Sequence, residues 1–163
     1  MKFARVGGFA VAVLAIATMA FAQAKTDFSG TWNLDTSAMT PPAGGGGGGG
    51  RGGGRGGLGM TFTAKQTADS LVITRTMGEN TVTTTYKLDG TESKNQMTGR
   101  GGQTMESVST TKWDGPKLVV TTKTAMGDQT FEQTQTWSLD GGVLTVETTG
   151  GRGGPQKFVY KKG

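Results

Sequence analysis

Apolar and polar residues alternate along most of the chain after residue 25. In segment 129–139 one face carries aromatic and aliphatic residues with two glutamines: Phe131, Gln133, Gln135, Trp137 and Leu139. The opposite face carries only Thr, Ser and Glu, and segment 80–88 repeats the arrangement with Val82, Thr84, Tyr86 and Leu88. A period of two predicts strands with one buried and one solvated face, which is typical of antiparallel sheets.

The same alternation predicts ten strands, at residues 28–34, 60–67, 70–76, 80–88, 94–99, 103–113, 117–124, 129–139, 142–149 and 156–162. Tight turns are predicted at Asp69-Ser70, Asp89-Gly90, Asp114-Gly115 and Asp140-Gly141-Gly142, because Asp and Gly tolerate positive φ. Nothing after Lys25 has a helical period. Because closure protects sheet edges, we predict an all-β chain forming a single antiparallel up-and-down β-barrel of about 8–10 strands.

An internal repeat supports this meander. Residues 71–90 and 118–141 each begin with Leu-Val, turn at Met-Gly-acid and close on aromatic-x-Leu-Asp-Gly. In a meander, alternate connections lie at the same end of the sheet. The prediction is therefore one end with tight Asp turns and another with Gly-rich loops at 40–59, 77–80, 99–102, 126–128 and 150–154.

The chain divides into two parts. Lys2 and Arg5 precede an apolar stretch from Gly7 to Ala20, and small residues at Ala22 and Ala24 fit a cleavage site. Residues 1–24 are therefore predicted to be a signal peptide, cleaved near Ala22 or Ala24 to give a secreted or periplasmic protein. Residues 25–163 form the predicted barrel domain. Within it, segment 40–59 contains the longest run of glycines in the chain and is predicted to be a disordered loop.

Composition then excludes several classes of function. The chain has no His and no Cys, which rules out thiol chemistry, a Ser–His–Asp triad and His/Cys zinc sites. A net charge of +5 is too small for a polyanion binder, and the Arg-Gly run at 51–57 lacks aromatics, so we expect no nucleic-acid partner. Methionine thioethers select Cu(I), but copper sites usually add His or Cys. We expect no metal, no cofactor and no enzymatic activity. Thr, Lys and Glu on the outward faces also disfavour a membrane-spanning barrel.

Three short segments resemble calycins, the group of lipocalins and fatty-acid-binding proteins. They are Phe28-Ser29-Gly30-Thr31-Trp32-Asn33-Leu34, Lys112-Trp113-Asp114-Gly115 and Val159-Tyr160-Lys161-Lys162. The resemblance implies a ligand-binding barrel plugged by Trp32, with Lys157 or Lys161 covering that ring. Two features depart from the fatty-acid-binding branch. Polyglycine stands where that branch has a helical lid, and Phe158 stands where it has a carboxylate-binding Arg.

Candidate site residues fall into two groups. The candidate cavity residues are Phe28, Trp32, Phe62, Tyr86, Trp113, Phe131, Trp137 and Tyr160, and the candidate rim residues are Arg51, Arg55, Arg100, Arg152, Met77 and Met126. Thr84, Gln133 and Gln135 share the inward faces, which indicates water or ligand inside. We expect an exported carrier of a small hydrophobic or weakly anionic ligand. The alternative is a barrel scaffold with a filled interior that contacts an envelope or protein partner through its basic Gly/Arg loops. The oligomeric state is left open.

Overall fold

The computed structural model describes residues 25–38, 57–77, 80–98, 104–150 and 154–163. These ranges hold ten strands and one short 3-10 helix, η1 (Thr36–Ala38). The strands are β1 (Gly30–Leu34), β2 (Thr61–Gln66), β3 (Ser70–Met77), β4 (Asn80–Lys87), β5 (Ser93–Thr98), β6 (Thr104–Asp114), β7 (Lys117–Met126), β8 (Gln129–Asp140), β9 (Val143–Gly150) and β10 (Gln156–Lys162). The predicted all-β class is confirmed, with every strand boundary within two residues of its predicted position. None of the helices in these ranges has the length and apolar character needed to span a membrane.

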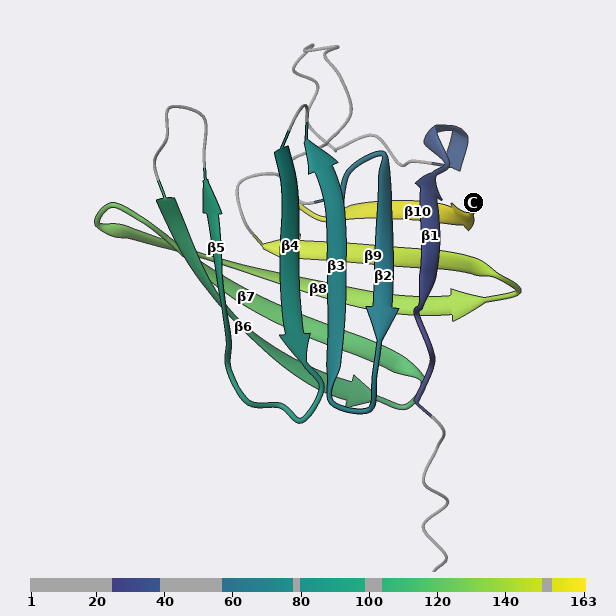
Figure 1. The fold of residues 1–163 in the computed structure, drawn as a ribbon, viewed down its shortest axis with the longest axis horizontal. Coiled ribbons are helices and arrows are strands. Elements are labelled where there is room, and N and C mark those ends of the chain that lie inside the picture. Colours follow the sequence, from purple (N-terminus) through teal and green to yellow (C-terminus); the bar gives the residue numbers. More distant parts are fainter. Residues whose placement is uncertain (1–24, 39–56, 78–79, 99–103, 151–153) are drawn as a thin grey trace, which may run out of the picture.

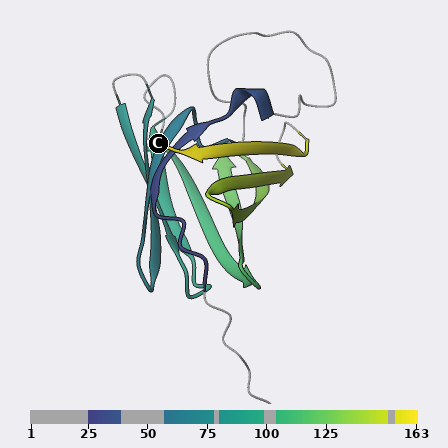
Figure 2. The ribbon, with the colours of Figure 1, turned by 90° about the vertical axis from the view of Figure 1, so that its right-hand side faces the viewer.

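All ten strands form one antiparallel sheet that is nearly closed into a barrel. Each strand pairs with the next along the chain, apart from β4 and β5, and β1 pairs with β10, where Trp32 lies opposite Lys162. Figure 1 shows β1 to β4 running steeply in the front layer while β6 to β10 cross behind them, and Figure 2 shows the two layers from the side. The predicted up-and-down barrel is therefore confirmed, with its sheet interrupted between β4 and β5.

Side chains bridge part of this interruption. The Thr85 backbone N–H donates to Asn95 Oδ1 at 2.8 Å, and Asn95 Nδ2 donates to the Thr85 carbonyl at 3.0 Å. The Lys87 N–H donates to Ser93 Oγ at 2.7 Å, and Thr111 Oγ1 donates to the Lys87 carbonyl at 2.5 Å. A side-chain amide carries the same donor and acceptor as a peptide group, so Asn95 substitutes for a ladder pair. Partly buried backbone groups of β4 thereby receive hydrogen-bond partners without a backbone ladder to β5.

The tight turns have the backbone geometry that their residues predict. Gly90, Gly115 and Gly141 have φ of +86°, +59° and +55°, which lie in the region that glycine adopts without steric cost. Because the strands run up and down in order, the turns β2–β3, β4–β5, β6–β7 and β8–β9 lie together at one end of the barrel. The strand ends that lead into the β3–β4, β5–β6, β7–β8 and β9–β10 connections lie at the other end.

One half of the interior is a packed cluster of rings, which we call the aromatic end: Phe28, Trp32, Phe62, Trp113, Trp137 and Tyr160. Phe28 and Phe62 meet Trp137 edge-on at centroid distances of 5.8 Å and 6.1 Å, and Phe62 meets Tyr160 edge-on at 5.0 Å. Edge-to-face contacts of this kind add to the stabilisation from burial. The rings at this end are buried and in contact with one another.

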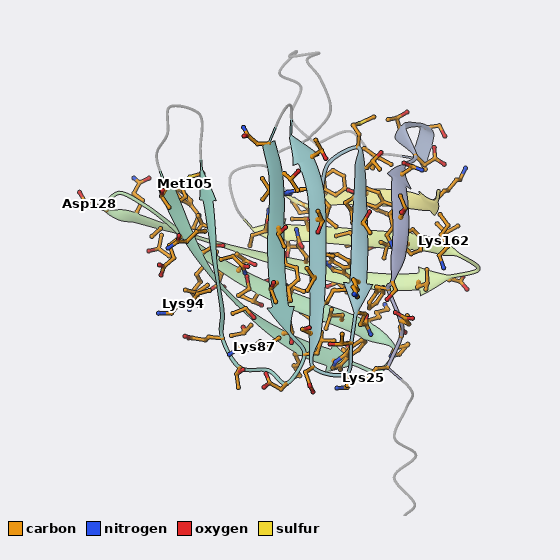
Figure 3. All side chains as sticks on the ribbon, in the orientation of Figure 1. Lys25, Lys87, Lys94, Met105, Asp128 and Lys162 are labelled. Atoms are coloured by element: carbon orange, nitrogen blue, oxygen red, sulfur yellow. The ribbon has the colours of Figure 1, made fainter. Side chains whose placement is uncertain are left out.

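Trp32 is fully buried, as expected of a plug, and its Nε1 donates to the Phe28 carbonyl at 2.9 Å. The cation over its ring is Lys162, with Nζ 5.8 Å from the centroid, so the expectation of Lys157 or Lys161 was wrong. The β1–β10 register explains the difference, since Lys162 is the residue directly opposite Trp32. Lys161 instead pairs with Asp35 at 2.8 Å. Lys162 is labelled in Figure 3 at this edge of the barrel.

Candidate ligand-binding site

The other half of the interior contains a cavity of about 220 Å³, which we call the cavity end. Its wall comes from β3, β4, β6, β7 and β8, with Gly57 and Leu58 completing it. Met105, labelled in Figure 3, lies in this wall near the start of β6. The lining side chains are mostly polar: Arg75, Thr84, Tyr86, Ser107, Ser109, Thr122, Thr124, Gln133 and Gln135, with Leu58, Ile73 and Met105.

The inward row of each long strand changes character along its length. On β7, Leu118 and Val120 face the aromatic end, whereas Thr122 and Thr124 face the cavity. On β8 the row runs from Trp137 to Gln135 and Gln133 in the same direction. Because inward residues recur every second position, one strand supplies both environments. The prediction that Thr84, Gln133 and Gln135 point into a hydrated or liganded interior space is confirmed as to placement, since all three line the cavity.

Hydrogen bonds hold part of this polar wall. The Ser109 and Thr122 hydroxyl oxygens lie 2.9 Å apart across the β6–β7 pair. Trp137 Nε1 donates to Gln135 Oε1 at 3.3 Å, where the aromatic end meets the cavity. Hydroxyl and amide groups that face a cavity keep lone pairs and protons for water or ligand. The wall is thus suited to a molecule with several polar groups.

Arg75 brings a positive charge to the cavity wall. It is the third inward residue of β3, after Leu71 and Ile73, and lies between Phe62 on β2 and Val82 on β4. Its Nη1 donates to the Gly57 carbonyl at 3.4 Å, and its buried Nε has no hydrogen-bond partner. Sequence analysis missed this residue because it considered only the loop arginines. The alternation Leu71, Ile73, Arg75 on a strand with a buried inward face was the pattern that could have found it.

Two buried phenols lie near Arg75. Burial raises the pKa of Tyr86, and the Arg75 charge opposes that shift. Burial likewise raises the pKa of Tyr160 to about 12, although the hydrogen bond from Leu58 and the charge of Arg75 act in the other direction. Both phenols are therefore neutral at neutral pH and keep their protons for donation.

Gly57 and Leu58 form one side of the cavity. Leu58 is buried, and its N–H donates to the Tyr160 hydroxyl at 3.1 Å. A Cβ on Gly57 would lie only 2.8 Å from the Phe158 ring, so only glycine fits without a shift. Residues 57–59 are the last residues of the predicted 40–59 loop. Residues 40–56 of that loop lie outside the described residues. The end of the Gly-rich segment is thus part of the site.

The predicted cavity residues occupy different places. Tyr86 lines the cavity. Phe131 is half-buried on the inward face of β8, two residues from Gln133. The other six make up the aromatic end: Phe28, Trp32, Phe62, Trp113, Trp137 and Tyr160. Whether any of the eight touches a ligand stays a prediction.

The predicted rim residues mostly lie beyond what the structure covers. Arg51, Arg55, Arg100 and Arg152 fall outside the described residues. Met77 and Met126 end β3 and β7, at the cavity end of the barrel, but their side chains are not described. Within the described ranges, no group of three or more Asp and Glu side chains could hold a metal ion.

Comparison with one solved structure supports the fold. No protein-family model matches the sequence, and no curated protein matches it. A solved structure titled REP1-NXSQ fatty acid transporter matches with a TM-score of 0.51 at 15% identity, over 83% of this chain and 95% of that one. Secretory abundant heat soluble protein 4 from Ramazzottius varieornatus has a TM-score of 0.47 at 22% identity, over 63% of this chain and 67% of that one. The chain has a calycin-like barrel.

Proposed function

We propose that this protein is an exported, non-catalytic carrier that binds one small molecule inside its barrel. The observation that carries the proposal is the cavity of about 220 Å³ with its convergent polar groups. Polar groups placed around an interior cavity are how small-molecule sites fix orientation and specificity. The solved structure with a similar fold is titled a fatty acid transporter, which agrees with a binding role for an interior of this kind.

The cavity favours a carrier over the alternative scaffold with a filled interior. A scaffold gains nothing from a polar interior, because buried polar groups cost stability unless they are hydrogen-bonded. Arg75 Nε, in the cavity wall, is buried and has no hydrogen-bond partner. A filled barrel would place apolar side chains at positions such as Thr84 and Thr122. The polar lining supports the weakly anionic ligand over the purely apolar one.

Native mass spectrometry of the protein purified from its own host tests the carrier function. We expect an additional mass that organic extraction removes. A Thr84→Phe variant, which fills the cavity from β4, should lose this mass. Thr83→Phe is the matched control, because Thr83 is exposed on the other face of the same strand and Phe suits strands equally well. A bare protein that also ignores fatty acids, sterols, isoprenoids and hydroxylated acids would contradict the proposal.

Export is the second part of the proposal and rests on residues 1–24, which lie outside the described residues. Their charged start, apolar stretch and small-residue sites support cleavage near Ala22 or Ala24. Intact mass and N-terminal sequencing of the host-derived protein should therefore give a chain that begins at Gln23 or Lys25. A mature chain that retains Met1 would overturn this part without affecting the binding proposal.

A further inference from the structure

The cavity wall contains a cation without a counter-charge. Among the described residues that line it, Arg75 is positively charged and no Asp or Glu is present. The described part of the chain places no carboxylate within salt-bridge distance of Arg75. Arg75 is half-buried, with its Nε shielded from solvent. Charges that lose contact with water are normally paired, because their desolvation is costly. The positive charge of the wall is therefore not balanced by its described lining residues, and an anion in the cavity would balance it.

The guanidinium also has hydrogen-bonding capacity to spare. Arg75 carries five N–H donors, of which Nη1 makes one long bond of 3.4 Å to the Gly57 carbonyl. Nε is shielded from solvent and has no partner at all. A carboxylate or phosphate can accept two parallel bonds from Nε and a terminal nitrogen, which is the geometry that guanidinium groups favour. A backbone carbonyl cannot supply that second acceptor.

Opposite Arg75, on the other layer of the barrel, the wall is rich in hydroxyl and amide groups. The β6–β7 pair brings Ser107 beside Thr124 and Ser109 beside Thr122, and β8 adds Gln133 next to Thr122. All five line the cavity. These groups can both donate and accept, as the hydroxyls of a ligand do. The cavity thus has an anion-binding side and a hydroxyl-binding side.

The size of the cavity and the packed rings beside it disfavour a long alkyl chain lying wholly inside the barrel. At about 220 Å³ the cavity is smaller than the roughly 300–1,000 Å³ typical of drug-sized sites. Beyond Ile73 and Gln135 the space is filled by Phe62, Trp137 and Tyr160, which pack edge to face. A chain that extended from Arg75 would have to displace these rings from a close-packed core.

We propose that the cavity selects a compact hydroxylated anion, whose carboxylate or phosphate binds Arg75 and whose hydroxyl groups bind the Ser, Thr and Gln rows of β6, β7 and β8. This inference rests on the proposed carrier function and names its ligand class. On binding, the anion takes over the Arg75 donors from the Gly57 carbonyl. Arg75 sets the charge preference, and the aromatic end limits the length of the ligand.

Calorimetric titration of the host-derived protein, extracted to remove bound molecules, tests the class with four probes. Glucuronate and glucose 6-phosphate represent carboxylate and phosphate sources, glucose is the neutral match, and palmitate is the long-chain acid. We expect one or both hydroxylated acids to bind at least about tenfold more tightly than glucose, with palmitate not binding in the interior. Which of the two acids binds more tightly identifies the anionic group.

Variants test the role of Arg75. Arg75→Met should weaken binding of the acid by about ten- to a hundredfold and leave glucose binding unchanged. Lys65→Met is the matched control, because it removes a cation from the exposed face of the adjacent strand β2 and should change neither affinity. In the unaltered protein, the Nε proton resonance of Arg75 should shift when the acid is added, which provides a readout independent of any variant's folding.

The outcomes separate this inference from the carrier function. Equal binding of glucose and the acids, an Arg75→Met protein that retains acid binding, or tight interior binding of palmitate alone would overturn the anion class and leave a carrier. Failure of both acids to bind would also overturn it. If, in addition, the host-derived protein carries no extractable mass and binds no fatty acid, sterol or isoprenoid, the carrier function itself is overturned.

Discussion

The two ends of the barrel interior are built by the same strands yet have opposite properties. At the aromatic end the inward side chains are large, apolar and in contact, and at the cavity end they are mostly polar and surround a void. Both copies of the internal repeat carry this change from apolar to polar inward residues within one strand. In β3 the inward row is Leu71, Ile73, Arg75, and in β7 it is Leu118, Val120, Thr122.

This difference separates stability from binding along the barrel axis. Close-packed apolar contacts provide most of the free energy of folding, and polar cavity walls provide little. Substitutions at the aromatic end should therefore act mainly on unfolding, and substitutions at the cavity end mainly on ligand affinity. The predictions below test this division in order of decreasing effect on stability.

Removal of a central ring should have the largest effect. Trp137→Ala leaves a void among Phe28, Phe62 and Leu118, and we expect a loss of about 3–5 kcal/mol in the free energy of unfolding. Urea denaturation measures this loss. Ser107→Ala at the cavity end is the comparison and should cost less than about 1 kcal/mol. Equal losses would contradict the division between the two ends.

Loss of the Asn95 side chain should have an intermediate effect. Asn95→Ala leaves the Thr85 N–H and carbonyl without the partners they have across the β4–β5 interruption, and we expect destabilisation by about 1–3 kcal/mol. Amide hydrogen exchange at Thr85 should accelerate as well. Gln96→Ala, an exposed neighbour on β5, is the control and should stay within about 0.5 kcal/mol of the unaltered protein. Unchanged exchange at Thr85 would show that the bridge is not formed in solution.

Removal of the cavity charge should change stability little. Arg75 makes one long hydrogen bond and lacks a carboxylate partner in the described ranges, so Arg75→Met should alter the free energy of unfolding by less than about 1 kcal/mol, in either direction. Urea denaturation of the ligand-free protein is the measurement. A larger loss would assign Arg75 a structural role and weaken the division drawn above.

The smallest effect is expected from acid titration of the surface at β1. The hydrogen bond from Lys161, followed by that from Ser37, lowers the pKa of Asp35 from 3.8 to about 2. Because the folded-state pKa lies below the unfolded value, this carboxylate stabilises the fold above pH 3.8, and that contribution is lost as the pH falls to about 2. Urea denaturation between pH 6 and pH 2 should show a shallower decline for Asp35→Asn than for the unaltered protein. Parallel curves would contradict the expected pKa.

The fold was predictable because strand periodicity and turn chemistry are local. Alternation located all ten strands, and Asp-Gly pairs located turns such as that at Gly90. The interruption between β4 and β5 was not predictable, because Asn95, Ser93 and Thr111 bond to the β4 backbone across distances in the chain that no local pattern encodes.

The site was predictable only in part. Inward polar residues such as Gln133 could be read from alternation, and they do line the cavity. The division into a packed half and a hollow half could not, because it depends on which rows of different strands meet at the same height in the barrel. Arg75 could not be singled out for the same reason. Its proposed role in binding an anion depends on the lack of an Asp or Glu among the described residues that line the cavity.

The pairing of β1 with β10 governs the order in which the molecule can be assembled. β1 is synthesised first among the strands and finds its β10 partner only when the last strand has been made. Hairpins such as β7–β8 can form early, since they need only neighbouring residues, but ring closure requires contact between distant parts of the chain. Until that moment Trp32 lacks the strand that carries its covering Lys162. We therefore expect closure to be a late folding step, and a chain that ends before β10 to leave the Trp32 ring without the lysine that covers it.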